Sequence, residues 1–188
     1  KVLHDLKGAR VGLMGHVLEA MYDMHSDPAA ISKTFGLHVP LLEIDDVVAL
    51  YNTVTDAEIA EKIKLIESEF DMPDPVSDPL TTKLTEPDLK QAAKTAVALD
   101  KLVEKYKLTG LAYYYEGLEN SVQRQVVSSF IVGNSILDAQ GVPMCGEFDI
   151  KTCIAMLIMD RLDIGGSFAE FHPFDFKEDF ILVGHDGP

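Results

Sequence analysis

The chain begins with a strand, a helix and a second strand in close succession, and this order restricts its fold more than any other feature. Residues 10–16 are a short apolar run, which indicates a buried strand. Residues 28–35 are predicted to form a helix, capped at 26–27 and stopped by Gly36. Residues 37–44 are the second strand. Such units pair their strands in parallel through a right-handed crossover, so we predict an α/β fold.

The rest of the chain continues this alternation. Further helices are predicted at 45–52, 56–70, 85–106, 122–139 and 151–162, and further strands at 109–115 and 142–145. Residues 72–84, rich in proline and aspartate, are predicted to be a loop, and residues 166–174 and 180–183 an antiparallel hairpin. We therefore predict a doubly wound, flavodoxin-like parallel sheet in residues 1–162. Residues 163–188 would begin a second, mostly missing domain.

Charge and cysteine content narrow the partners and the compartment. The net charge of −15 disfavours nucleic acid and anionic membrane surfaces as partners. Two cysteines, Cys145 and Cys153, are too few for a disulfide framework, which favours a reducing, cytoplasmic compartment. The chain starts at Lys1 without a methionine and ends at Pro188 inside a glycine-rich motif. We expect it to be part of a longer protein and to be inactive alone.

Two glutamates and a histidine lie at the edges of apolar segments in the last part of the chain. Glu147 follows the strand at 142–145, Glu170 lies in the predicted hairpin, and His185 follows its second strand. Carboxylate oxygens and an imidazole nitrogen suit a divalent metal such as Mn²⁺, and carboxylates can also act as general acid and base. The spacing alone is equally consistent with two strand-end glutamates and a turn histidine.

The sequence around these three residues resembles the L-arabinose/L-fucose isomerase superfamily. Residues 146–152 (Gly-Glu-Phe-Asp-Ile-Lys-Thr) are similar to the family motif Gly-Glu-x-Asp-x-Lys-Thr, and residues 167–170 to Ser-Phe-x-Glu. The resemblance implies that Glu147, Glu170 and His185 are metal ligands. A fourth family ligand, a histidine nearer the C-terminus, has no counterpart in this chain.

Several neighbouring residues are further site candidates. Asp149 and Lys151 are an N-cap and a surface lysine by their chemistry, whereas the resemblance implies that they support the first ligand. Tyr115 and Glu116 follow an ordinary half-buried strand by their pattern, whereas the resemblance implies an aromatic–glutamate pair that packs near the sugar. Phe168 and His172 flank Glu170, which makes them candidates for the wall of the substrate pocket; an exposed or hydrogen-bonded strand residue is the alternative for His172.

The resemblance implies a metal-dependent aldose–ketose isomerase that needs no organic cofactor. Glu147 and Glu170 would relay a proton between C2 and C1 of an open-chain sugar through an ene-diolate, in a homo-oligomer with active sites at subunit boundaries. Two alternatives are a non-catalytic sugar-binding or regulatory α/β domain and a purely structural subunit. Departures from arabinose isomerases at Phe148, Ile150 and 186–188 leave the sugar unspecified. The sequence does not specify the metal either.

Overall fold

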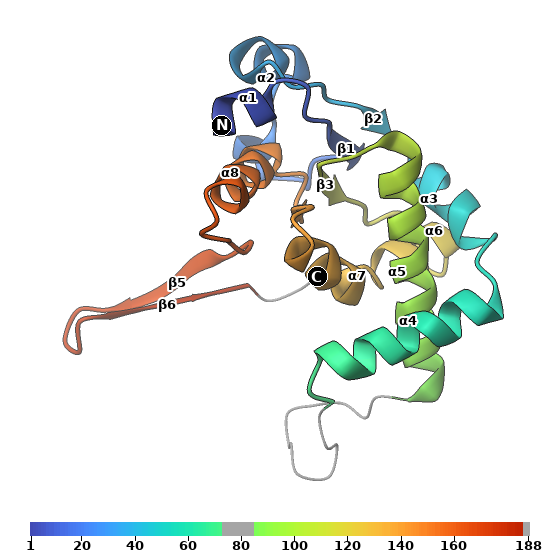
Figure 1. Ribbon diagram of the computed structural model, residues 1–188. Coiled ribbons are helices and arrows are strands. Elements are labelled where there is room, and N and C mark those ends of the chain that lie inside the picture. Colours follow the sequence, from blue (N-terminus) through green and yellow to red (C-terminus); the bar gives the residue numbers. More distant parts are fainter. Residues whose placement is uncertain (73–84, 186–188) are drawn as a thin grey trace.

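Four parallel strands form the centre of the molecule in a computed structural model, which describes residues 1–72 and 85–185 (Figure 1). Their order across the sheet is β2-β1-β3-β4. The strands are β1 (Val11–Gly15), β2 (Leu41–Leu42), β3 (Gly110–Tyr114) and β4 (Met144–Cys145). This order, with helices on both faces, confirms the predicted doubly wound α/β fold. The predicted loop at 72–84 lies outside the described residues except for Met72.

Side chains of the two central strands alternate between two separate hydrophobic cores. Met14 of β1 and Leu111 and Tyr113 of β3 belong to the first core. Leu13 of β1 and Ala112 of β3 belong to the second. Because successive strand residues point to opposite faces, a fully buried strand contributes to both cores.

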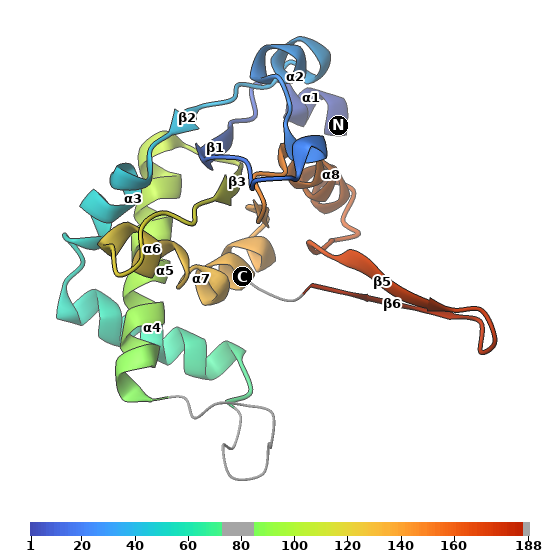
Figure 2. The same cartoon turned by 180° about the vertical axis from the view of Figure 1, so that it is seen from behind.

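Four helices of the described part of the chain cover the first core. They are α3 (Ile44–Tyr51), α5 (Glu86–Tyr106), α6 (Val122–Val127) and α7 (Ile131–Ala139). Helix α4 (Asp56–Glu69) packs on the outer side of α5, as the view from behind also shows (Figure 2). Ile66, Ala93 and Ile136 form a third, smaller cluster between α4, α5 and α7.

The second core is covered by α1 (Val2–Leu6), α2 (Pro28–Phe35) and α8 (Ile150–Arg161). Helix α8 contributes the largest share, through Ile150, Cys153, Ile154 and Leu157. Its N-terminus lies directly after β4, so the burial of α8 also fixes the segment between them.

The predicted single helix at 122–139 is wrong, because the structure breaks it into α6 and α7. The hydroxyls of Ser128 and Ser129 both donate to the carbonyl of Gln125, an interaction that competes with helical hydrogen bonding. Phe130, which follows, is fully buried and meets the ring of Tyr113 edge-on at 4.9 Å. Burying this ring in the first core redirects the chain at the break.

The second strand is also shorter than predicted. Residues 37–44 pair with β1 through a bridge between Arg10 and His38 and through β2 alone. Pro40 lies between them and has no N–H to donate, which limits the regular pairing. Two short helical segments were not predicted, namely α1 and a 3₁₀ turn at Tyr22–Met24.

The predicted hairpin is present and projects from the sheet domain (Figures 1 and 2). It consists of β5 (Glu170–Asp175) and β6 (Phe180–Gly184), paired antiparallel. Within residues 1–72 and 85–185, no helix is long and apolar enough to cross a membrane. Cys145 and Cys153 are both buried free thiols.

The crossing of α5 and α7 predicts one position where added volume is not tolerated. A Cβ atom at Gly133 would lie 2.8 Å from Leu99 Cδ1 and 3.1 Å from Ala96 Cα. We expect Gly133→Val to lower the free energy of unfolding by about 2 kcal/mol, because the helices must move apart. Ser135→Val, on the exposed side of the same helix, should change it by less than about 0.5 kcal/mol. Urea denaturation measures both, and equal effects would contradict this packing.

Asp138 predicts a pH-dependent stability. Its Oδ1 accepts a hydrogen bond from the backbone N–H of Met144 at 2.7 Å, and burial raises the pKa of its carboxyl from 3.8 to about 6. The carboxyl of Asp138 therefore binds its proton more tightly in the folded than in the unfolded state. Its contribution to the free energy of unfolding falls as pH rises from about 4 to about 6. Asp138→Asn keeps the acceptor without the charge. It should stabilise the protein by about 1 kcal/mol at pH 7.5.

At pH 4 the two proteins should have nearly equal free energies of unfolding. Thermal or urea unfolding across this pH range measures the difference. A stabilisation of the same size at every pH would contradict the titration of Asp138.

Candidate active site

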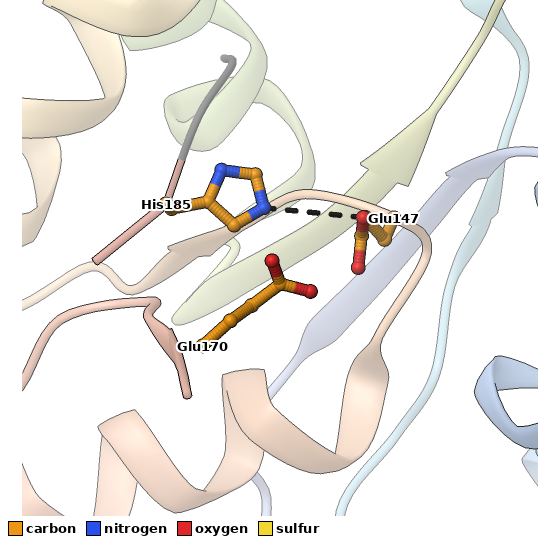
Figure 3. A group of neighbouring side chains, drawn as sticks. All are labelled: Glu147, Glu170 and His185. Carbon is orange, nitrogen blue, oxygen red and sulfur yellow. Dashed lines mark ion pairs between the residues drawn. The ribbon is translucent and has the colours of Figure 1, made fainter. Parts of the chain in front are cut away.

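Glu147, Glu170 and His185 point toward one another at the carboxyl edge of the sheet (Figure 3). One donor atom from each residue lies within 4.8 Å of the other two. Nε2 of His185 is 3.9 Å from Oε1 of Glu147, and the two side chains are only 15% and 18% exposed. Residues that are far apart in the sequence therefore present two carboxylates and an imidazole to one point.

An unusual turn aims Glu147 at this point. Glu147 and Phe148 both have left-handed backbone conformations, with φ of +55° and +63°. Such conformations cost non-glycine residues roughly 1 kcal/mol or more each and concentrate at functional sites. The backbone N–H of Phe148 donates to the carbonyl of Tyr113 at 3.0 Å, and the Phe148 side chain packs on the second core. These contacts with β3 and the core hold the strained turn.

Asp149 then ends the turn by starting α8. Its Oδ1 accepts from the backbone N–H groups of Lys151 at 3.0 Å and Thr152 at 3.1 Å, and its Oδ2 accepts from the Thr152 hydroxyl at 2.6 Å. Asp149 is one of two buried polar residues in the described part of the chain. The predicted N-cap is thus present, and it fixes the residue two positions after Glu147.

The hairpin supplies the other two members of the cluster together. Glu170 is the register partner of Gly184, which places His185 directly beyond the paired strands. The His185 ring also packs against Phe168, with ring centroids 4.6 Å apart. Phe168 in turn packs on the second core. Antiparallel pairing and this aromatic contact therefore join Glu170 and His185 to the sheet domain.

The electrostatics of the cluster favour binding of a cation. Burial raises the pKa of the Glu147 carboxyl, the Glu170 carboxylate raises it further, and His185 opposes this shift. Oε2 of Glu147 and Nε2 of His185 are buried without a hydrogen-bond partner among the described residues. Buried polar atoms normally have partners, so these two atoms are available to bind a ligand. Two oxygens and one nitrogen fit a divalent cation.

Two cavities adjoin the cluster. The first, about 280 Å³, is bordered by Glu147 and by the end of β3, and its wall includes Tyr115, Glu116 and Arg124. The second, about 130 Å³, is bordered by Phe168 and His185. The first is close to the lower end of the size range of ligand pockets, about 300 Å³, so a small polar molecule would fit beside the cluster.

Comparison with protein families identifies the scaffold. The L-arabinose isomerase central domain matches residues 20–165. The chain belongs to this family. No curated protein matches the chain. The family match covers Glu147 in the sheet domain, whereas Glu170 and His185 lie beyond residue 165.

Within this isomerase scaffold, three of the four predicted substrate residues line a cavity beside the cluster, and one does not. Tyr115 and Glu116 line the first cavity, and Phe168 lines the second. His172 borders neither cavity; its Nε2 lies 3.2 Å from the carbonyl oxygen of Gly184. Lys151 is exposed, and its Nζ donates to the carbonyl of Asp23. The roles of all five residues in substrate or ligand support stay predictions.

Sequence reasoning missed several residues of the first cavity in the isomerase scaffold, among them Tyr114 and Arg124. Tyr114 precedes the predicted pair, and Arg124 lies in the helix that follows β3. The available signal was positional, because a helix following a strand brings its first turn to the carboxyl edge of the sheet. Ser121, a good N-cap three residues before Arg124, marks that first turn.

The cap of α8 predicts a measurable loss of stability. Asp149→Ala removes all the oxygen acceptors of this buried side chain and should lower the free energy of unfolding by about 1–2 kcal/mol. Asp149→Asn keeps one acceptor oxygen and should cost less than half as much. Urea denaturation of the metal-free protein gives both values. An alanine variant as stable as the wild type would show that the cap does not hold the turn.

Proposed function

We propose that the protein is a metal-dependent aldose–ketose isomerase of the L-arabinose/L-fucose isomerase type. The observation that carries this proposal is the convergence of Glu147, Glu170 and His185 within 4.8 Å. The family of the sheet domain supports it, because that scaffold belongs to isomerases of sugars. A purely structural subunit would need neither the strained turn at Glu147 and Phe148 nor two buried side-chain atoms that lack hydrogen-bond partners among the described residues.

The three clustered residues would hold a divalent metal. Oε2 of Glu147 and Nε2 of His185, buried without partners among the described residues, fit this role, and a Glu170 oxygen lies within the same group. A bound divalent ion supplies Lewis acidity, which polarises a carbonyl and stabilises negative charge on neighbouring oxygens. We propose Mn²⁺ because its preferred donors are carboxylate oxygens and imidazole nitrogen.

The two carboxylates would move the proton. In an aldose–ketose conversion a base removes the proton from C2 and an acid returns it to C1, while the carbonyl passes from C1 to C2. Glu147 and Glu170 would share this relay. Burial and Glu170 raise the pKa of Glu147, which favours its protonated form.

The cavity next to Glu147 would receive the open-chain sugar. At about 280 Å³, and with Tyr115 and Glu116 in its wall, it offers an aromatic surface and an acceptor for hydroxyl groups. Phe168 would border the substrate from the side of the hairpin. His172, which borders neither cavity, would contribute to substrate binding from farther away. Asp149 and Lys151 would support Glu147 by fixing the start of α8.

Assembly and compartment belong to the same proposal. We propose a cytoplasmic homo-oligomer in which residues 163–188 begin a second domain after the sheet domain of residues 1–162. Two buried free thiols support a reducing compartment. The net charge of −15 supports a small-molecule sugar as the partner and disfavours nucleic acid and membranes.

Glu170→Gln tests the mechanism. The substitution keeps the size of the side chain but removes a strong anionic ligand and a proton acceptor. We expect turnover of aldoses by the full-length protein to fall about 10²–10⁴-fold at saturating Mn²⁺, while the melting temperature of the metal-free protein stays unchanged. Mn²⁺ titration calorimetry should show weaker binding.

Glu178→Gln is the matched control. Glu178 lies in the turn of the same hairpin, so its variant should keep wild-type turnover and Mn²⁺ affinity. Wild-type turnover by Glu170→Gln would remove Glu170 from the mechanism. Mn²⁺ and sugar binding by the wild-type protein without turnover on any aldose would favour the non-catalytic sugar-binding domain instead.

A further inference from the structure

Arg124 has a cationic side chain in the wall of the cavity that Glu147 borders. It lies in the first turn of α6, where its backbone N–H donates to the Ser121 hydroxyl at 3.1 Å. Val126 and Val127, later in the same helix, are buried in the first core. The backbone that carries Arg124 is therefore held at both ends of this short helix.

The Arg124 guanidinium has no partner within the described residues. No carboxylate of residues 1–72 or 85–185 lies within 4.0 Å of it, and no side-chain hydrogen bond reaches it in this part of the chain. A guanidinium has five N–H donors in a rigid plane and no acceptor. Arg124 is half-buried, so a ligand in the cavity would meet these donors with part of their water already removed.

Glu116 lines the same cavity and provides the complementary chemistry. It accepts one hydrogen bond from the Tyr114 hydroxyl at 3.3 Å. A carboxylate has about four acceptor positions, so most of its capacity is available to a ligand. The wall thus holds one group that only donates and one that only accepts, and their charges cancel.

A sugar hydroxyl both donates and accepts, so two neighbouring hydroxyls match this wall. An anionic ligand matches it less well, because Glu116 and Glu147 both border the cavity. Arg124 and Glu147 border the same cavity but form no ion pair with each other among the described residues. Arg124 is therefore free to contact a part of the ligand that the cluster does not hold.

We infer that Arg124 is a specificity-determining residue that, together with Glu116, binds two adjacent hydroxyls of the sugar chain on carbons remote from C1 and C2. This inference rests on the proposed function, since it takes the occupant of the cavity to be an open-chain aldose. Residues of the sheet domain, Arg124 and Glu116, would then recognise the hydroxyls that are remote from C1 and C2.

Binding of linear polyols tests the inference without turnover. The probes are a linear pentitol and its analogue lacking the terminal hydroxyl at the remote end, titrated calorimetrically into Mn²⁺-loaded protein. Arg124→Gln should weaken pentitol binding about 10- to 100-fold, because hydrogen bonds to charged groups are lost. It should weaken binding of the deoxy analogue clearly less, and leave Mn²⁺ affinity and the melting temperature unchanged.

Arg161→Gln is the matched control. The Arg161 guanidinium interacts with Asp160 and with the carbonyl of Gly141, and it borders neither cavity beside the cluster. Its variant should bind the pentitol like the wild type. Arg124→Lys should recover only part of the affinity, since an ammonium cannot reproduce two parallel donors.

Unchanged pentitol binding by Arg124→Gln, with intact Mn²⁺ binding, would overturn the inference and leave the proposed isomerase untouched. An equal loss for the pentitol and its deoxy analogue would overturn it too, since Arg124 would then not read the remote hydroxyl. Pentitol binding by a wild-type protein that never isomerises an aldose would remove the proposed function while Arg124 keeps its role in recognition.

Discussion

The pairing of β3 with its two neighbours is the interaction on which the site depends. At the end of β3, two backbone carbonyl groups accept further hydrogen bonds: that of Tyr113 from the backbone N–H of Phe148, and that of Tyr114 from the backbone N–H of His16. The backbones of β1 and β3 approach each other so closely at this edge that a Cβ atom at Gly15 would lie 1.9 Å from the carbonyl oxygen of Tyr114. The end of β3 therefore fixes both the turn that carries Glu147 and the cavity beside it.

Several features of the site oppose folding in the absence of a ligand. Two successive residues, Glu147 and Phe148, adopt left-handed conformations. Two buried side-chain atoms of the site, Oε2 of Glu147 and Nε2 of His185, lack hydrogen-bond partners in the described part of the chain. Burial and the Glu170 carboxylate also disfavour the charged form of Glu147. The two cores on either side of the sheet offset these costs. A ligand that binds only this folded arrangement would stabilise the protein in proportion to its occupancy.

The hairpin couples two of the three clustered residues to one another. Glu170 opens β5, and His185 follows β6 directly, so any shift of the hairpin moves both together relative to Glu147. The contact of Phe168 with His185 and with the second core is what ties this pair to the sheet. Most of the hairpin beyond this contact projects from the molecule (Figure 1), and Phe171 and Phe176 are exposed there.

The sequence by itself determined the fold class, because apolar runs of strand length alternate with amphipathic helices and define a parallel sheet. It also determined the caps at Thr85 and Asp149, since capping depends on residues only two or three positions apart. The motif around Glu147 placed this residue after a strand, and the structure brings Glu170 and His185 to it. Their role as ligands stays a prediction from the sequence.

Only the tertiary structure decided the break at Ser128–Phe130, whereas Pro40, which limits β2, is visible in the sequence. The local pattern favoured a continuous helix in the first case, but burial of Phe130 against Tyr113 is a contact between residues 17 positions apart. The membership of Arg124 in the cavity was hidden for the same reason. Ser121 marks the first turn of this helix, but which side chain faces the sheet edge depends on how its valines pack into the core. Local hydrogen bonding and periodicity can be read along a chain, whereas cavities arise from packing between distant segments.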